Sequence, residues 1–144
     1  MHKVFGEKLI GTNYKDRPGA YLLHIKNGKV AVVKNPKGFF LIGGGLELGE
    51  TGEECIAREC MEEIGYTVTV KNKICSAEAY MYHKKAGYFH PIQTYYAGSV
   101  DCMKGYPLEK DHTLMWLDYT EIKGKLYLEM QNWAIEYYWN EINK

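Results

Sequence analysis

Seven glutamates and a single basic residue, Arg58, lie in the stretch GGGLELGETGEECIARECMEEIGY at residues 43–66. If this stretch is helical, Glu59 and Glu63 lie one turn apart, with Cβ atoms about 5–6 Å from each other, and Glu62 points to the same side. Like charges crowded in this way repel by roughly 0.2–0.5 kcal/mol per pair. Converging carboxylate oxygens suit Mg²⁺ or Mn²⁺ and not zinc. The spacing therefore predicts a bound divalent cation that offsets the repulsion.

A solvated helix face is the alternative explanation for these carboxylates. A solvated face normally mixes Glu with Lys or Arg, because opposite charges four residues apart stabilise a helix. The face with Glu59, Glu62 and Glu63 carries one sign only. The glycines at 43–45 also allow phosphate to approach the backbone closely. Together these residues predict a site that holds a metal ion against a phosphate group.

From Gly44 to Tyr66 the sequence resembles the Nudix box, the motif of the Nudix hydrolase (MutT-like) family. The box is a glycine, five residues, a glutamate, seven residues, and then Arg-Glu-apolar-x-Glu-Glu-x-Gly-apolar. The matching positions are Gly44, Glu50, Arg58, Glu59, Cys60, Glu62, Glu63, Gly65 and Tyr66. Cys60 and Tyr66 are atypical, but a buried cysteine behaves as a small hydrophobic residue. The resemblance implies an α/β fold, an α/β/α sandwich around a mixed β-sheet.

The same resemblance implies a Mg²⁺-dependent hydrolase, with Mn²⁺ as the alternative cofactor. Its substrate would be a nucleoside diphosphate derivative: a nucleoside triphosphate, a dinucleoside polyphosphate or a nucleotide sugar. Glu62 and Glu63 would be metal ligands together with the Gly43 carbonyl. Glu59 would either ligate the metal or act as the base that activates water. Gly44 would let the substrate approach the backbone.

Some members of the family take an additional catalytic carboxylate from a loop far downstream. The segment PLEKDH offers Glu109 and Asp111 in about the right place, and we prefer Glu109. Loop charges in water are the alternative for both residues.

Two residues near the predicted carboxylates have structural explanations as well. Arg58 lies four residues from Glu62 and four from Glu54, so we expect it to orient carboxylates rather than to touch substrate. Glu50 precedes the predicted helix, where the helix dipole favours an anion. It is either an outer metal ligand or a loop contact.

A predicted strand near residues 68–83 supplies candidates for contact with the base. Side chains at Glu78, Tyr80 and Tyr82 alternate onto one face, and Tyr80 and Tyr82 could stack on a purine. Ordinary half-buried sheet aromatics are the alternative. The opposite face, which looks like core, carries Cys75, Ala77, Ala79 and Met81.

The elements that must position these residues have local signals. Thr51 and Glu54 have capping-box spacing, which predicts a helix from about Gly52, and Gly65 is a natural stop. On this helix the predicted buried stripe is Ala57, Cys60, Met61 and Ile64. Asn27-Gly28 predicts a hairpin within residues 20–34.

Further strands are predicted in GFFLIGGG, in residues 68–83 and 88–100 and in TLMWLDY. Pro91 would push the 88–100 strand toward a sheet edge or a bulge. A packed helix is predicted at the end of the chain, with its buried positions at Leu126, Met130, Trp133 and Tyr137.

Composition limits the remaining possibilities. The chain has 144 residues, with 18 Lys plus Arg against 18 Asp plus Glu, which predicts one domain over 1–144 and no bulk attraction to a nucleic acid polymer or a membrane. The N-terminus lacks an apolar signal core and the four cysteines form no framework, so we expect a cytoplasmic protein with reduced thiols. An edge strand and surface aromatics are compatible with a homodimer.

Two other functions fit parts of the sequence. A non-catalytic Nudix-like sensor or regulatory domain would bind a nucleotide without cleaving it, but a binder has no need of the full set of Arg58 and three glutamates. A thiol-based metal or redox protein would use Cys55 and Cys60, whose five-residue offset places them on different helix faces.

Overall fold

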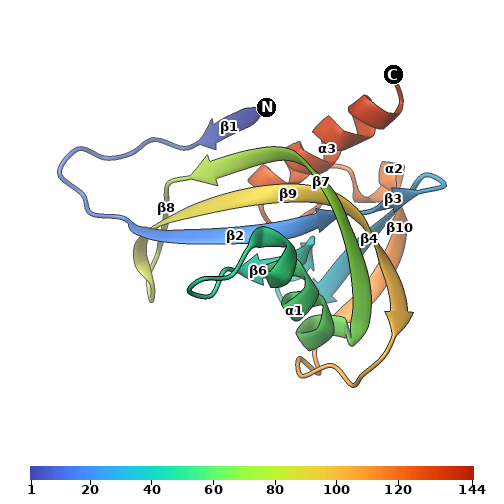
Figure 1. The fold of residues 1–144 in the computed structure, drawn as a ribbon. Coiled ribbons are helices and arrows are strands. Elements are labelled where there is room, and N and C mark those ends of the chain that lie inside the picture. The colour runs from blue at the N-terminus through green and yellow to red at the C-terminus, as the bar shows by residue number, and fades with distance from the viewer.

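The computed structural model describes residues 1–144, which form two β-sheets and three helices (Figure 1). The larger sheet has the order β1 (His2–Phe5), β7 (Tyr66–Ala79), β9 (Gly87–Met103), β2 (Lys15–Leu23) and β6 (Ile42–Gly45), and β8 (Met81–His83) also pairs with β9. The smaller sheet contains β10 (Thr113–Asp118), β4 (Lys29–Asn35), β3 (Ile25–Lys26) and β5 (Gly38–Phe40). Because β1–β7 and β2–β9 are parallel and the other pairs antiparallel, the predicted mixed sheet is confirmed.

The helices α1 (Gly52–Ile64) and α3 (Glu129–Ile142) lie on opposite sides of the larger sheet (Figure 1), and α2 (Tyr119–Ile122) is a single turn after β10. Strand residues alternate between the two cores. Ala20 and Leu22 pack in the cluster with α1, whereas Leu23 packs in the cluster with α3. Burial on both faces explains why these strands read as continuous apolar runs. No helix is long and apolar enough to cross a membrane.

The predicted ends of α1 are confirmed. The Thr51 hydroxyl accepts the Glu54 N–H at 3.1 Å, and the Glu54 carboxylate accepts the Thr51 N–H at 2.9 Å. Gly65 ends the helix in a left-handed conformation, with φ at 73°. This capping fixes where the helix starts, and therefore which residues share a face.

The predicted buried stripe of α1 is partly wrong. Ala57 is exposed and Met61 half-buried, whereas the buried residues are Cys55, Ile56, Cys60, Glu63 and Ile64. The helix is rotated so that Glu63 faces inward, where its carboxylate accepts the Gly43 N–H at 3.1 Å. Periodicity alone treats every glutamate as a surface residue.

Two predicted strands change sheets partway. The turn at Asn27-Gly28 is confirmed, with φ at 54° and 75°. The predicted strand before it is divided: β2 belongs to the larger sheet, and only the two residues of β3 pair within the smaller sheet. The segment GFFLIGGG likewise divides into β5 and β6 at Leu41. Side chains satisfy backbone groups at both breaks: His24 Nδ1 accepts the Val100 N–H at 3.0 Å, and Gln131 Oε1 accepts the Leu41 N–H at 2.9 Å.

The strand that contains Pro91 is central, so of the two predicted alternatives, a sheet edge or a bulge, the edge is wrong. β9 lies between β7 and β2, and Pro91 falls opposite the interruption between β7 and β8. Tyr80, at that interruption, donates its N–H to the Phe5 carbonyl at 3.1 Å instead. Pro91 has no backbone N–H to donate. This is tolerated because the strand beside β9 is interrupted between β7 and β8 at that point.

The other sequence predictions are closer to the structure. Cys75, Ala77 and Ala79 are buried and Met81 is half-buried, as the alternation predicts. β10 forms at TLMWLD, and the final helix begins at Glu129. On this helix Met130 is buried, while Trp133 and Tyr137 are half-buried; Leu126 is also buried but lies before the helix, not on it as predicted.

Candidate active site

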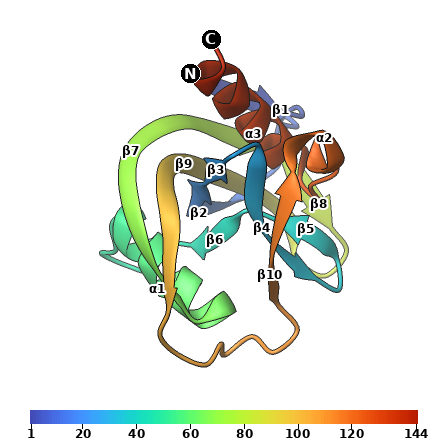
Figure 2. The same cartoon turned by 90° about the vertical axis from the view of Figure 1, so that its right-hand side faces the viewer.

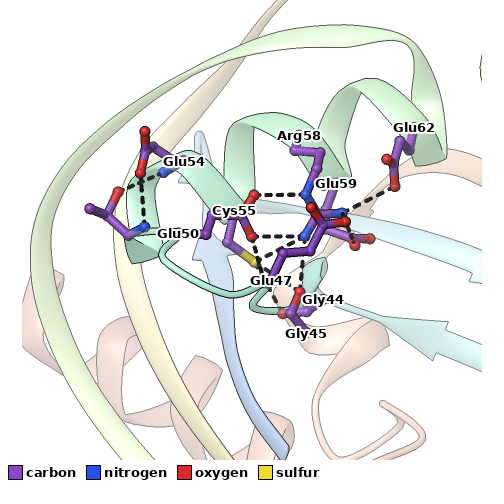
Figure 3. A network of polar contacts seen from close by, with 10 residues as sticks. Gly44, Gly45, Glu47, Glu50, Glu54, Cys55, Arg58, Glu59 and Glu62 are labelled. Atoms are coloured by element: carbon purple, nitrogen blue, oxygen red, sulfur yellow. Dashed lines mark hydrogen bonds and ion pairs between the residues drawn. The ribbon is translucent and has the colours of Figure 1, made fainter.

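Arg58 is the centre of a polar network that joins α1 to the loop before it (Figure 3). Its guanidinium donates to both carboxylate oxygens of Glu50, at 2.7 and 2.9 Å, and to the Gly45 carbonyl at 2.9 Å. It also donates to Glu59 at 2.7 Å and to Glu62 at 3.3 Å. One rigid side chain therefore fixes the loop and two carboxylates of the helix relative to one another.

The structure shows the loop contact considered for Glu50. Glu50 is the bidentate partner of Arg58, and this hydrogen bonding lowers the pKa of its carboxyl to about 2. It also accepts the Glu47 N–H at 3.0 Å. Glu50 thus links the loop to Arg58, and its role as an outer metal ligand stays a prediction. The predicted Arg58–Glu54 pair does not form, because the Glu54 carboxylate is used in the helix cap.

Glu59 lies directly against the glycine loop. A Cβ on Gly44 would lie 2.5 Å from the Glu59 carboxyl carbon and 2.6 and 2.9 Å from its two oxygens. Burial raises the pKa of Glu59, and the hydrogen bond from Arg58 opposes that change. Only glycine leaves this carboxylate room beside the backbone of β6.

Glu63 is the most buried of the carboxylates. Its side chain is 11% exposed, and burial together with the charges of Glu59, Glu109 and Glu62 raises its pKa to about 8, against the opposing hydrogen bond from the Gly43 N–H. The prediction that the three helix carboxylates point the same way is therefore only partly correct. The Glu62 side chain is 34% exposed and faces outward, whereas Glu63 faces the β6 backbone.

The loop between β9 and β10 is docked on the C-terminal end of α1. Lys104 and Gly105 donate their N–H groups to the Gly65 carbonyl, and Leu108 and Glu109 donate theirs to the Glu62 carbonyl at 2.8 and 3.1 Å. These bonds satisfy carbonyls that a helix end leaves free. They also bring Glu109 close enough for its charge to raise the pKa of Glu59 and Glu63.

His112 joins this group from the same loop. Its Nε2 lies 3.8 Å from the Glu63 carboxylate and its Nδ1 lies 2.9 Å from Asp111. Ligand atoms of Glu109, Asp111 and His112 lie within 4.8 Å of one another. The structure thus places Glu59, Glu62, Glu63 and Glu109 around one region, with Asp111 at its edge.

A cleft of about 490 Å³ opens beside the glycine loop. Gly45 and Tyr21 line it, and burial followed by the charges of Glu63 and Glu59 raises the pKa of Tyr21. The cleft wall therefore adjoins the carboxylates. Two cations, Arg17 and Lys37, also line the cleft, and the Arg17 guanidinium lies over the Phe89 ring at 4.7 Å.

The family model described as NUDIX domain matches residues 15–137 of the chain. The chain belongs to the Nudix family. This match extends well beyond the box at residues 44–66, so it includes the docked loop and most of α3. No curated protein matches the chain in sequence.

Solved Nudix structures share the fold at low sequence identity. A MutT protein from Methanosarcina mazei Go1 has a TM-score of 0.71 and 16% identity, with 93% of this chain and 99% of that chain covered. A Nudix hydrolase from Nitrosomonas europaea has a TM-score of 0.69 and 18% identity, covering 88% and 90%. A MutT Nudix hydrolase from Burkholderia pseudomallei has a TM-score of 0.65 and 20% identity, covering 85% and 97%. The fold expected from the Nudix box is confirmed.

The two tyrosines predicted to meet the base differ in surroundings. Tyr82 lines the cleft of this Nudix domain and lies against Tyr88, with ring centroids 4.8 Å apart. Tyr80 does not line the cleft. One face of its ring stacks on His90 at 4.5 Å, and Tyr14 lies edge-on to it. One ring face of Tyr80 is therefore occupied within the protein, and its contact with the base stays a prediction.

Apart from Tyr82, the residues that line the cleft from outside the Nudix box carry no signal in the sequence. Arg17, Lys37 and Tyr127 come from β2, the turn before β5 and the segment before α3. No spacing rule joins them, because the two sheets bring them together. His112 could have been predicted from the sequence, because it follows Asp111 in the segment PLEKDH, which was considered for its carboxylates.

The thiols of the Nudix helix are not reactive groups. Cys55 and Cys60 are both buried, and burial raises the pKa of their thiols to about 11 and about 12. Cys55 Sγ donates to the Gly44 carbonyl at 3.3 Å. Protonated buried thiols are poor nucleophiles and poor metal ligands.

Gly44→Ala tests the contact between the glycine loop and Glu59. We expect the variant to fold and kcat/KM to fall roughly 10- to 100-fold, because the new methyl group displaces the carboxylate. Steady-state kinetics and the melting temperature give the two readouts. Gly45→Ala is the control, since its Cβ would meet only the Pro18 carbonyl at 3.9 Å and should cost less activity. Equal losses in both variants would contradict the contact.

Proposed function

We propose that this Nudix protein is a Mg²⁺-dependent hydrolase, with Mn²⁺ as an alternative, that cleaves the pyrophosphate linkage of a nucleoside diphosphate derivative. The observation that carries the proposal is the convergence of Glu59, Glu62, Glu63 and Glu109 beside an open cleft. The cleft has cations for phosphates and aromatic rings for a base, which suits a nucleotide.

The residues present fit a hard divalent cation. The carboxylate region has only Arg58 as a fully charged cation, and Arg58 is already engaged by Glu50. Burial raises the pKa of Glu63, and the charges of Glu59, Glu109 and Glu62 add to the increase, which supports a site where a cation would offset neighbouring negative charges. Glu59, Glu62 and Glu63 would hold the metal, with the Gly43 carbonyl as a further ligand. When bound, the ion would neutralise the diphosphate and polarise its phosphoryl oxygens.

The protein side chains divide the remaining work. Arg58 is a positioning residue, because its donors hold Glu59 and Glu62 in place. Glu109 is exposed and faces the helix carboxylates, so it is the base that takes a proton from the attacking water. Glu59 is a weaker candidate base, since Arg58 donates to its carboxylate at 2.7 Å. Arg17 and Lys37 bind the substrate phosphates in the cleft.

A substrate panel tests the proposal. The purified chain with Mg²⁺ is incubated with nucleoside triphosphates, dinucleoside polyphosphates, nucleotide sugars and ADP-ribose, and products are separated by chromatography. We expect cleavage between phosphates for at least one class, and loss of turnover when EDTA removes the metal. Turnover of no class, together with nucleotide binding, would favour the sensor or regulatory domain instead.

Glu109→Gln separates the two loop carboxylates. On the best substrate of the panel, we expect kcat to fall about 100-fold, since general base catalysis contributes on the order of 10²–10⁴. Asp111→Asn is the matched control and should retain most of the activity, because Asp111 pairs with His112, whereas the charge of Glu109 raises the pKa of Glu59 and Glu63. A larger loss of kcat in Asp111→Asn than in Glu109→Gln would instead identify Asp111 as the base.

Lys37→Gln and Arg17→Gln test the cleft. Each substitution is expected to raise KM about 3- to 10-fold with little change in kcat, because the cations bind ground state and transition state alike. The exposed Lys8→Gln, outside the cleft, is the control for the loss of one charge. A fall in kcat at constant KM would contradict the assigned role.

A further inference from the structure

A second cavity, of about 710 Å³, lies away from the carboxylates and the cleft. It is lined from β3, β7, β9, β10, α3 and the break after β2, and Figure 2 shows these elements. No residue of the cleft and none of the four carboxylates lines it. Its volume is that of a site for a small ligand, which is roughly 300–1,000 Å³.

Two lysines of this cavity form no salt bridge, although the charge of Lys71 acts on Asp101 in the same cavity. Lys26 and Lys71 are exposed, and among all Lys and Arg residues only Lys29, Arg58 and Lys144 form ion pairs. Both lysines lie near enough to His24 to act on its ionisation. The cavity therefore offers two exposed cations outside any salt bridge, which suits a phosphate group.

Asp101 gives the cavity an oriented acceptor. Its two oxygens accept hydrogen bonds from the Thr69 hydroxyl at 2.5 Å and the Ser99 hydroxyl at 2.7 Å. These bonds lower the pKa of Asp101, so the carboxylate is charged. Each oxygen keeps a free lone pair, and a carboxylate held in this way can accept two N–H groups at once.

The wall of the cavity is aromatic. Trp116 is 41% exposed, a large fraction for a tryptophan, and it lies edge-on to His24 with centroids 4.8 Å apart. His24 is only 8% exposed, and its Nδ1 accepts the Val100 N–H. The proton of the neutral ring is then on Nε2, which has no partner in the protein. Tyr138 completes the wall.

We propose that this cavity is a second ligand site for a guanine nucleoside monophosphate. Asp101 accepts the two adjacent N–H groups of the guanine edge, Trp116 contacts the ring, and Lys26 and Lys71 bind the phosphate. The site is separate from the hydrolytic site and does not depend on the substrate proposed for it.

Site-resolved NMR titration of the full chain with GMP tests this proposal. We expect saturable shifts of the Val100 amide and the Trp116 indole N–H. Lys26→Gln/Lys71→Gln should raise the Kd at this site about ten-fold, whereas the control Lys8→Gln/Lys125→Gln, with the same loss of charge at exposed positions, should not. Shifts confined to the cleft residues Tyr21, Gly45 and Tyr82 would overturn the proposal.

Two further probes test the chemistry of the ligand. AMP, which lacks the paired donors, should bind more weakly than GMP, and Asp101→Asn should reduce that preference. Equal affinities for AMP and GMP in the wild-type protein would overturn the role of Asp101. Inorganic phosphate should not shift the Trp116 indole at concentrations that saturate GMP, and an equal response to phosphate alone would overturn the heterocycle site. Because GMP contains no pyrophosphate linkage, these results are independent of the hydrolysis assay.

Discussion

Glu63→Gln is expected to lower kcat/KM by at least about 100-fold while making the metal-free protein more stable at alkaline pH. The loss of activity follows from the loss of one anionic ligand to the proposed metal ion, which contributes several kcal/mol to transition-state stabilisation. The fold should persist, because the glutamine side-chain oxygen can still accept the Gly43 N–H. Activity is measured on the best substrate at saturating Mg²⁺.

The gain in stability follows from the pKa of Glu63. Burial raises it from 4.5 to about 8, so the folded chain binds this proton more tightly than the unfolded chain. The resulting stabilisation is complete below about pH 4.5 and is lost as the pH rises from there through about 8, which costs on the order of 5 kcal/mol. Glutamine carries no charge at any pH. In EDTA, the melting temperature of Glu63→Gln minus that of wild type should therefore increase from pH 5.5 to pH 8.5.

Glu62→Gln is the matched control for this prediction. Its side chain is 34% exposed, against 11% for Glu63, so its activity should fall while its stability follows the pH dependence of the wild type. A Glu63→Gln protein with wild-type kcat/KM would contradict the ligand role. A melting-temperature difference that is the same at both pH values would contradict the burial of a charge.

Arg58→Lys is expected to lower kcat about 100-fold with little change in KM, and to lower the melting temperature by several degrees. The guanidinium reaches both oxygens of Glu50, the Glu59 carboxylate and the Gly45 carbonyl at 2.7–2.9 Å. A lysine ammonium is a single point with three donors and cannot span these groups. Misplacing a catalytic carboxylate by about 1 Å can cost 10²-fold. Because we propose that Arg58 positions carboxylates and does not bind the substrate, KM should change little.

Two conservative variants distinguish the partners of Arg58. Glu50→Gln should reproduce part of the defect of Arg58→Lys, because the bidentate ion pair is lost. Glu54→Gln should behave like the wild type, since glutamine also serves in a capping box and Glu54 does not contact Arg58. A kinetic defect in Glu54→Gln equal to that in Glu50→Gln would contradict the network.

The sequence by itself determined the features that depend on near neighbours in the chain. The cap at Thr51 and Glu54, the stop at Gly65 and the turn at Asn27-Gly28 all form as predicted, because their hydrogen bonds and dihedral angles involve residues a few positions apart. The spacing of the Nudix box likewise specified one helix with its carboxylates and its arginine.

Tertiary structure decided what depends on distant residues. It chose Glu50 over Glu54 as the partner of Arg58, turned Glu63 inward and occupied one ring face of Tyr80 with His90. It moved the chain between sheets at His24, a break at which a side chain accepts a backbone donor 76 residues away. Helical spacing is fixed by the backbone, whereas sheet membership and loop docking are fixed by the packing of segments that no local pattern connects.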